Sequence, residues 1–192
     1  MSFFTLNVPE TIALTDDQLF ELCSSNRESN IERDSNGNII IMSPAGGQSS
    51  IINAAVTALF FNWNQKEKKG VVFDSSGGFL LKDGSMRSAD VAWISNQRWK
   101  RLSDEQKEKF PPLAPDFIIE IRSRTDQIGV LKTKMEAWIA NGVSLAWLID
   151  PIDRSICIYE SEQEATSIDN FHEVIEATKV VEGFRLDLSS LI

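Results

Sequence analysis

The strongest constraint on the fold is a strand–helix–strand pattern between residues 115 and 151. The run "DFIIEIRS" is apolar enough for a buried strand, and apolar residues then recur at helical spacing from about Asp126 to Asn141. Gly142 favours a helix end, and the second strand, "SLAWLID", stops at Pro151. Two strands joined by one helix through short connections predict a parallel, right-handed crossover inside a sheet.

Shorter elements surround this unit. A capping box of Thr15 and Gln18 predicts a helix that ends near Asn26, and Asn36-Gly37 predicts a hairpin between two short strands. Apolar residues at helical spacing predict a long helix from about Gln48 to the charged run "NQKEKKG". The remaining predicted elements are short strands "VVFD", "GFLLKDG", "ADVAWIS" and "SICIYE", a brief helix after Ser103, and a loop over 160–170.

The fold class that follows is α/β (α+β), with a central mixed sheet flanked by helices. At 192 residues and 42% hydrophobic, the chain is long enough for one well-buried domain and short for two. We therefore expect one domain over residues 1–192. It divides into an N-terminal helical segment of about 1–28, a core of about 30–160 and a C-terminal arm of about 161–192.

Composition limits the chemistry. Cys23, Cys157 and His172 are too few for a Cys/His zinc site, so any catalytic metal must be bound by oxygen. The start "MSFFTLNVPE" lacks the features of a signal peptide, and no run approaches the roughly 20 apolar residues of a membrane span. We expect a cytoplasmic protein that does not interact with membranes.

The net charge of −9 argues against non-specific nucleic-acid binding. The charge is unevenly distributed, because residues 150–187 carry ten acidic side chains against three basic ones. Residues 122–134 instead form a basic stretch with a single acid, Asp126; its bases are Arg122, Arg124, Lys132 and Lys134. Such a stretch predicts a local site for an anionic partner.

Two carboxylates stand out on predicted strands. Glu120 interrupts an apolar run, and strand alternation places it on one face with Ile118 and Arg122. A buried carboxylate needs a compensating cation, so Glu120 is either half of a structural salt bridge or part of a site. Asp90 precedes the short strand "VAWIS" and is either an ordinary strand-end aspartate or a second acid of the same site. Two such acids with a nearby lysine suit Mg²⁺, which binds one or two carboxylates together with water and phosphate.

The runs "RSADVAWIS", "APDFIIEIRS", "KTKMEAWIANGV" and "LAWLIDP" resemble the Uma-type family of restriction endonucleases, which is assigned to the PD-(D/E)XK nuclease superfamily. The resemblance extends from about residue 30 to the end of the chain. It implies a restriction-endonuclease-like fold and a DNA-cutting activity that depends on Mg²⁺ or Mn²⁺. It also makes Asp90 and Glu120 the metal-binding acids.

The same resemblance implies the other site residues. The motif has a lysine two residues after the glutamate, where this chain has Arg122, which stays protonated and cannot act as a base. The resemblance therefore selects Lys134 on the following helix as the catalytic lysine, while helical geometry alone also allows Lys132. Glu32 matches a further family acid that can join the metal site, although an exposed hairpin position is the alternative.

Two polar residues are weaker candidates. Gln48 starts the long helix and either faces the site or caps the helix, and Ser123 matches a family serine but can also cap backbone groups. The resemblance further implies a homodimer, with the apolar segment "GFRLDLSSLI" at the two-fold interface. The competing hypothesis is a non-catalytic module that keeps the nuclease fold for binding or assembly.

Overall fold

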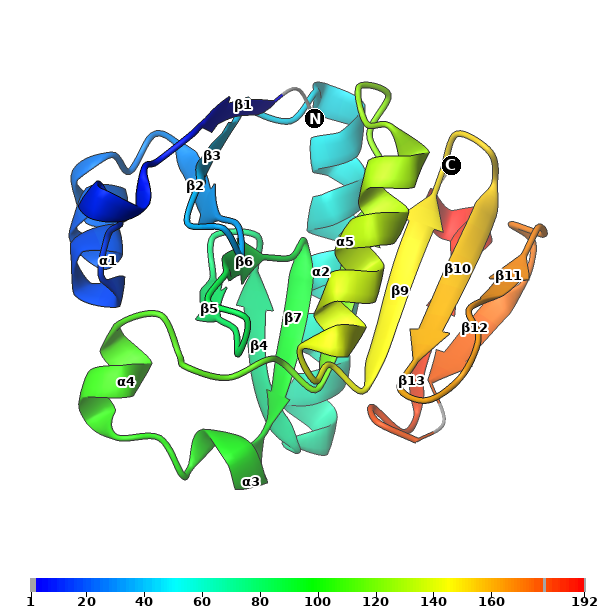
Figure 1. Cartoon of the computed structure of the whole chain (residues 1–192). Helices are drawn as coiled ribbons and strands as arrows, with labels where there is room; N and C mark the ends of the chain where they lie inside the picture. Colours follow the sequence, from blue (N-terminus) through cyan, green and yellow to red (C-terminus); the bar gives the residue numbers. More distant parts are fainter. Residues whose placement is uncertain (1–2, 178, 192) are drawn as a thin grey trace.

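A six-stranded sheet runs through the centre of the protein (Figure 1). The computed structural model describes residues 3–177 and 179–191. The strand order is β11-β10-β9-β8-β7-β4, and β8 and β9 are parallel while the other neighbouring strands are antiparallel. These strands are β4 (Gly70–Asp74), β7 (Val91–Ser95), β8 (Phe117–Ile121), β9 (Leu145–Asp150), β10 (Ser155–Glu160) and β11 (Thr166–Ile168). The predicted parallel pair and the mixed sheet are confirmed.

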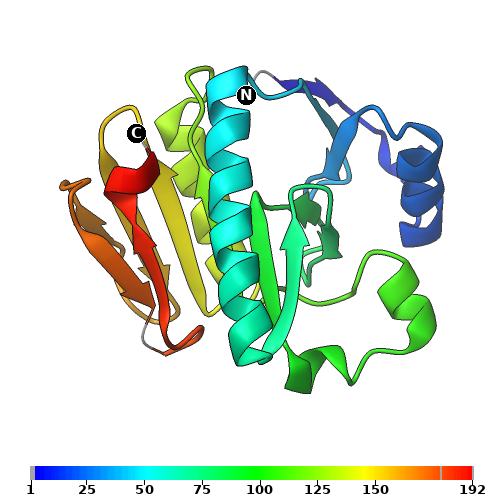
Figure 2. The ribbon, with the colours of Figure 1, turned by 180° about the vertical axis from the view of Figure 1, so that it is seen from behind.

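Two helices cover opposite faces of this sheet (Figures 1 and 2). Helix α5 (Ile128–Ala140) lies on one face and buries Met135 and Trp138, as expected from its apolar stripe. Helix α2 (Gly47–Glu67) lies on the other face and buries residues four apart, namely Ile52, Val56, Phe60 and Asn64. Both helices match their predicted ranges to within two residues.

Strand alternation divides the core between these helices. In β8, Phe117 and Ile119 belong to the cluster on the α2 side, while Ile118 belongs to the cluster on the α5 side. In β7, Trp93 faces α2 and Ile94 faces α5. Glu120 therefore lies on the α5 side, as the alternation predicted.

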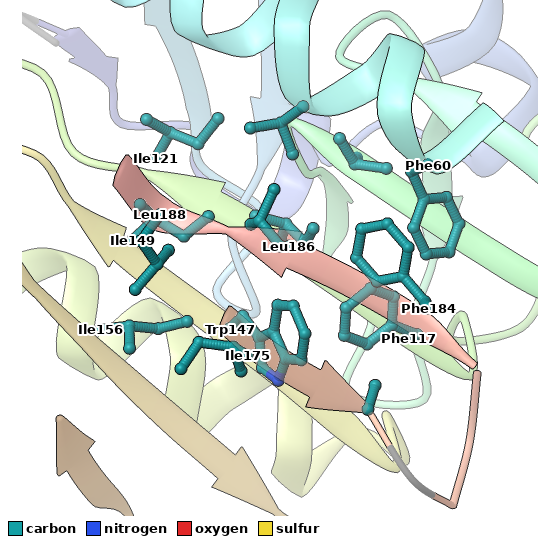
Figure 3. Packing of buried hydrophobic residues seen from close by; sticks show 14 of the residues in the cluster. Phe60, Phe117, Ile121, Trp147, Ile149, Ile156, Ile175, Phe184, Leu186 and Leu188 are labelled. Atoms are coloured by element: carbon teal, nitrogen blue, oxygen red, sulfur yellow. The ribbon is translucent and has the colours of Figure 1, made fainter. Parts of the chain in front are cut away.

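The C-terminal segment completes the core on the α2 side. It forms the hairpin of β12 (Val174–Ala177) and β13 (Phe184–Asp187), followed by a 3₁₀ turn, η2 (Leu188–Leu191). Figure 3 shows Phe184 beside Phe60 and Phe117, and the Phe60 and Phe184 rings meet edge to face with centroids 4.6 Å apart. The prediction that this segment seals a dimer is wrong for its main apolar residues, because Phe184, Leu186 and Leu188 are buried within their own chain.

The N-terminal part forms a second sheet in the order β1-β3-β2-β6-β5. Its strands are β1 (Phe3–Leu6), β2 (Asn30–Arg33), β3 (Ile39–Met42), β5 (Gly78–Leu80) and β6 (Met86–Ser88). The β2–β3 hairpin turns at Gly37, whose φ of +85° suits glycine. Around this sheet lie η1 (Glu10–Ile12), α1 (Asp16–Ser25) and α4 (Asp104–Glu108), whereas α3 (Asn96–Trp99) contacts β4 and β7 of the central sheet. The predicted capping boxes at Thr15 and Ser103 are present.

Several short elements differ from expectation. Strands β1, β6 and β12 and helix α3 carry too few patterned residues to be predicted, and the expected loop over 160–170 contains β11. That strand forms because Ile168 pairs with Ile156 across the sheet edge, a tertiary contact that the local Ser- and Glu-rich composition does not reveal. In the described part of the chain, no helix is long and apolar enough to cross a membrane.

Candidate active site

Asp90 and Glu120 meet at one end of two neighbouring strands. Val91 of β7 pairs with Ile119 of β8, so Asp90, just before β7, stands beside Glu120. The Asp90 Oδ2 accepts a hydrogen bond from the backbone N–H of Ile121 at 2.7 Å. The antiparallel register of two short strands therefore brings together acids that are 30 positions apart in the sequence.

Lys134 reaches this pair of acids from α5. Its Nζ lies 2.8 Å from Glu120 Oε1, 3.2 Å from Glu32 Oε1 and 2.9 Å from the carbonyl oxygen of Ser88. Three acceptors match the three donors of an ammonium group. Lys132 is exposed instead and lines a cavity of about 420 Å³ with Asp150 and Asp153. Of the two lysines that helical geometry allowed, the structure brings Lys134 to the acids.

Glu32 comes to the same place from the N-terminal sheet. Its side chain is buried, with the residue only 3% exposed, and Oε1 also accepts a hydrogen bond from the Ser88 N–H at 3.0 Å. Ser88 ends β6, and β6 lies next to β2 in the N-terminal sheet. The alternative of an exposed hairpin residue is therefore wrong.

Three contacts of the site were not predicted from the sequence. Asn53 of α2 donates its Nδ2–H to Asp90 Oδ1 at 2.5 Å, and Asn53 Oδ1 in turn accepts from the Thr57 hydroxyl at 3.2 Å. Trp138 donates its indole N–H to Glu120 Oε1 at 3.2 Å. The sequence did contain one indication of such a contact, because the polar Asn53 lies beside Ile52 on the inward face of α2. Polar side chains on an inward face normally have hydrogen-bond partners.

Burial changes the protonation behaviour of this cluster. Burial raises the pKa of Glu120 to about 7, even though the Lys134 ammonium opposes the shift. Burial also raises the pKa of Asp90, although the hydrogen bond from Ile121 acts in the opposite direction. Burial alone would lower the pKa of Lys134, but Glu120 and Glu32 raise it above its ordinary value. Lys134 therefore carries its proton at neutral pH, and Glu120 titrates there.

The other candidates lie elsewhere. Arg122 forms ion pairs with Asp150 at 2.6 Å and Asp153 at 2.7 Å beyond the end of β9. Gln48 is exposed in the first turn of α2, and the N-cap of that helix is Gly46 without a side-chain hydrogen bond, so the capping interpretation of Gln48 is wrong. Ser123 lies in the loop before α5, with its Oγ 3.1 Å from Thr125 Oγ1.

The predicted basic stretch is therefore largely neutralised by pairing. Arg122 is held by two aspartates and Lys134 by two glutamates. Arg124 and Lys132 are the members of the stretch that are exposed. Any attraction of this surface for an anionic polymer rests mainly on these two side chains and falls with salt.

The charges and donor atoms of the cluster suit a hard divalent cation. Three carboxylates and one ammonium carry a net charge of −2 when all are ionised. Among the described residues, no donor other than Lys134 and Trp138 reaches the Glu120 carboxylate, and both bind Oε1, which leaves Oε2 open. In the same part of the chain, no group of three or more His, Cys, Asp or Glu side chains is arranged to hold a metal ion. Two carboxylates completed by water and phosphate remain a normal Mg²⁺ environment.

Comparison with known proteins places the chain in one protein family. Residues 16–189 match the Uma2 family, described as "Putative restriction endonuclease", and the chain belongs to this family. No curated protein matches the chain at a significant level.

A solved structure shares nearly all of the fold. It is titled a "putative nuclease belonging to DUF820" from Anabaena variabilis ATCC 29413, and it superposes with a TM-score of 0.76 at 20% identity. The similarity covers 93% of this chain and 97% of that one. At this identity the match establishes the shared fold, which is that of the expected restriction-endonuclease-like class.

Proposed function

We propose that this protein is a Mg²⁺- or Mn²⁺-dependent endonuclease that hydrolyses phosphodiester bonds in DNA. The observation that carries the proposal is the meeting of Asp90 and Glu120 at adjacent strand ends, with the Lys134 ammonium 2.8 Å from Glu120. Membership of a family described as "Putative restriction endonuclease" supports the same chemistry.

Asp90 and Glu120 would hold the cation, because they meet at adjacent strand ends, Asp90 half-buried and Glu120 buried, and each has a raised pKa in its absence. A bound cation would stabilise negative charge on the phosphate and provide an activated water molecule. Asn53 and the Ile121 N–H orient the Asp90 carboxylate, and Trp138 orients that of Glu120. Glu32 contributes mainly by holding Lys134, since its Oε1 already accepts from Lys134 and Ser88.

Lys134 acts in this proposal as a fixed positive charge. Its pKa is raised by Glu120 and Glu32, so it remains an ammonium at neutral pH and cannot serve as a general base. A half-buried ammonium can instead donate a hydrogen bond to a phosphoryl oxygen and stabilise charge that develops during cleavage. This role requires only that one of its three present acceptors give way to the substrate.

A non-cleaving module is the second candidate, and a specific observation favours it. Lys134 already satisfies all three of its donors within the protein, and the motif position that normally carries lysine holds Arg122 in an ion pair with Asp150. The net charge of −9 also opposes tight binding to DNA.

A plasmid-nicking assay in Mn²⁺ at low salt separates the two candidates. We expect wild type to nick and Glu120→Gln to lose at least about a hundredfold in rate, the size expected for a group that stabilises the transition state. Lys132→Ala is the control, because Lys132 lies on the same helix but is exposed. Absence of metal-dependent cutting by folded wild type, over a range of salt and DNA forms, would support the non-cleaving module.

A further inference from the structure

The outer face of α2 is unusual for a surface helix. No charged residue occurs from Gly47 to Gln65, although the chain as a whole carries a net charge of −9. Figure 2 shows α2 at the front of that side of the molecule. Ile51 is 65% exposed and Phe61 is 49% exposed on this helix. Soluble monomers seldom expose large apolar side chains together on one uncharged face.

Four of the exposed residues of α2 form a regular seam. Ile51, Ala54, Ala58 and Phe61 are all exposed and follow one another at steps of three, four and three residues. At about 100° per residue, these positions lie opposite the buried stripe of Ile52, Val56 and Phe60. Steps of three and four are the spacing by which one helix packs along another in a coiled coil.

We propose that α2 is the contact surface of a homodimer, in which the exposed seam packs antiparallel against the same seam of a second copy. The inference rests on this helix face and does not depend on nuclease activity. It also provides an interface for the dimer expected from the sequence, in place of the C-terminal segment that is buried in its own core.

The order of side chains in the seam favours a second copy. Along the seam the side chains are large, small, small and large, and their positions are symmetric about position 56. A two-fold axis there places Ile51 beside the partner's Phe61 and Ala54 beside the partner's Ala58, and the same contacts repeat in reverse. Such an isologous contact needs a surface that complements itself. The two alanines allow the helix backbones to approach closely at the centre.

Charge and size limit this dimer to a weak one. Two copies with a net charge of −9 repel each other, and an uncharged helix face lets them meet without opposing carboxylates. The 21-residue helix is about 30 Å long, so a single helix pair falls at the low end of interface sizes, below about 1,200 Å² in total. We therefore expect dissociation in the micromolar range.

Sedimentation velocity from about 5 to 200 µM tests the proposal. Wild type should shift from monomer to dimer over this range, and Phe61→Glu should stay monomeric throughout. Val174→Glu is the matched control, because Val174 is an apolar residue of similar exposure, 47%, on β12. It should dimerise like wild type, and circular dichroism should show that both variants are folded. A wild type that is monomeric throughout, or a Phe61→Glu variant that dimerises like wild type, would overturn the proposal.

A charge pair tests the antiparallel register. In Ile51→Lys/Phe61→Glu, each new lysine would lie beside the partner's new glutamate, whereas within one chain the two positions are ten residues apart along the helix. We expect the double variant to recover at least tenfold of the dimer affinity lost in Phe61→Glu. Failure to recover would contradict the antiparallel seam, and a parallel pair would place like charges together and leave the double variant monomeric.

Discussion

Two charged clusters lie at the ends of the neighbouring parallel strands β8 and β9, and they differ in balance and burial. Arg122, Asp150 and Asp153 form ion pairs in which Asp153 is well exposed, and Asp150 also accepts backbone N–H bonds from Ile152 and Asp153 in the turn after β9. Glu32, Asp90, Glu120 and Lys134 form the other cluster, with three acids against one base. The first is a structural ion pair that closes a turn, and the second has an excess of buried negative charge.

The position of a residue on β8 does not by itself decide which of the two charged clusters its side chain joins. Glu120 and Arg122 are two residues apart and project to the same side of β8, yet their side chains join different clusters. The difference lies in which charges surround each group. An excess of buried carboxylates is unfavourable without a cation, and this is the property expected of a metal site.

The largest expected difference between the clusters concerns activity. Lys134→Ala should reduce plasmid nicking on the order of 10²–10³-fold, as expected for the loss of a charge that stabilises the transition state. Arg122→Ala should retain most of the activity, because Arg122 contacts Asp150 and Asp153 and not the acids of the site. Initial rates in Mn²⁺ provide the measurement. If Arg122→Ala is as inactive as Lys134→Ala, the division into two clusters is wrong.

Thermal melting with and without Mn²⁺ sharpens the comparison without requiring the right DNA. A cation that binds only the folded protein stabilises it by about 2.7 kcal/mol at a hundredfold excess over Kd. Wild type should melt higher with Mn²⁺, and Asp90→Asn should lose most of that shift.

Asp153→Asn provides the control, because it changes an acid of the other cluster and should keep the full Mn²⁺ shift. Without metal, Asp90→Asn should stay within about 1 kcal/mol of wild type, since relief of buried charge offsets the disturbed bond to Asn53. Equal Mn²⁺ shifts in wild type and Asp90→Asn would show that Asp90 does not hold a metal ion.

The pH dependence of stability follows from the raised pKa of Glu120. The unfolded carboxyl titrates near pH 4.5 and the folded one near 7, so the folded protein binds more protons between these values. Its free energy of unfolding therefore decreases as pH rises from about 4.5 to 7, on the order of 2–3 kcal/mol from this group. Glu120→Gln should remove this dependence. Urea titrations of both proteins at pH 5 and 7 measure it, and an identical pH slope in the two would contradict a buried, titrating Glu120.

The smallest expected effect concerns the support of Asp90 by α2. Asn53→Ala removes the amide that donates to Asp90 Oδ1 and should weaken Mn²⁺ binding about tenfold, the scale of a hydrogen bond to a charged group. Thr57→Val, which removes only the hydroxyl that orients Asn53, should weaken it less than about threefold. Isothermal titration calorimetry with Mn²⁺ distinguishes these values. A larger effect at Thr57 than at Asn53 would show that this chain of hydrogen bonds does not act through Asp90.

Local patterns in the sequence were sufficient to predict most of the helices and strands of the fold. The capping boxes at Thr15 and Ser103, the turn at Gly37, the helices α2 and α5 and the parallel pair β8–β9 were all predicted. Each depends on contacts between residues close in sequence or on a hydrophobic period that one element displays by itself. The short strands β1, β6, β11 and β12 were missed because pairing partners elsewhere stabilise them.

The features of the candidate site also fall into those that the sequence determined and those that only the tertiary structure decided. The sequence alone determined that Glu120 is buried on a strand face, since alternation in an apolar run has only two outcomes, and it narrowed the lysine to Lys132 or Lys134. Only the tertiary structure decided that Glu32 is buried, that Arg122 turns to Asp150, and that Asn53 and Trp138 hold the two acids. The reason is physical: the position of a charge along the chain determines its face, but its partner is set by which elements pack together. That packing depends on contacts between residues far apart in the sequence, such as Lys134 and Glu32, which are 102 positions apart.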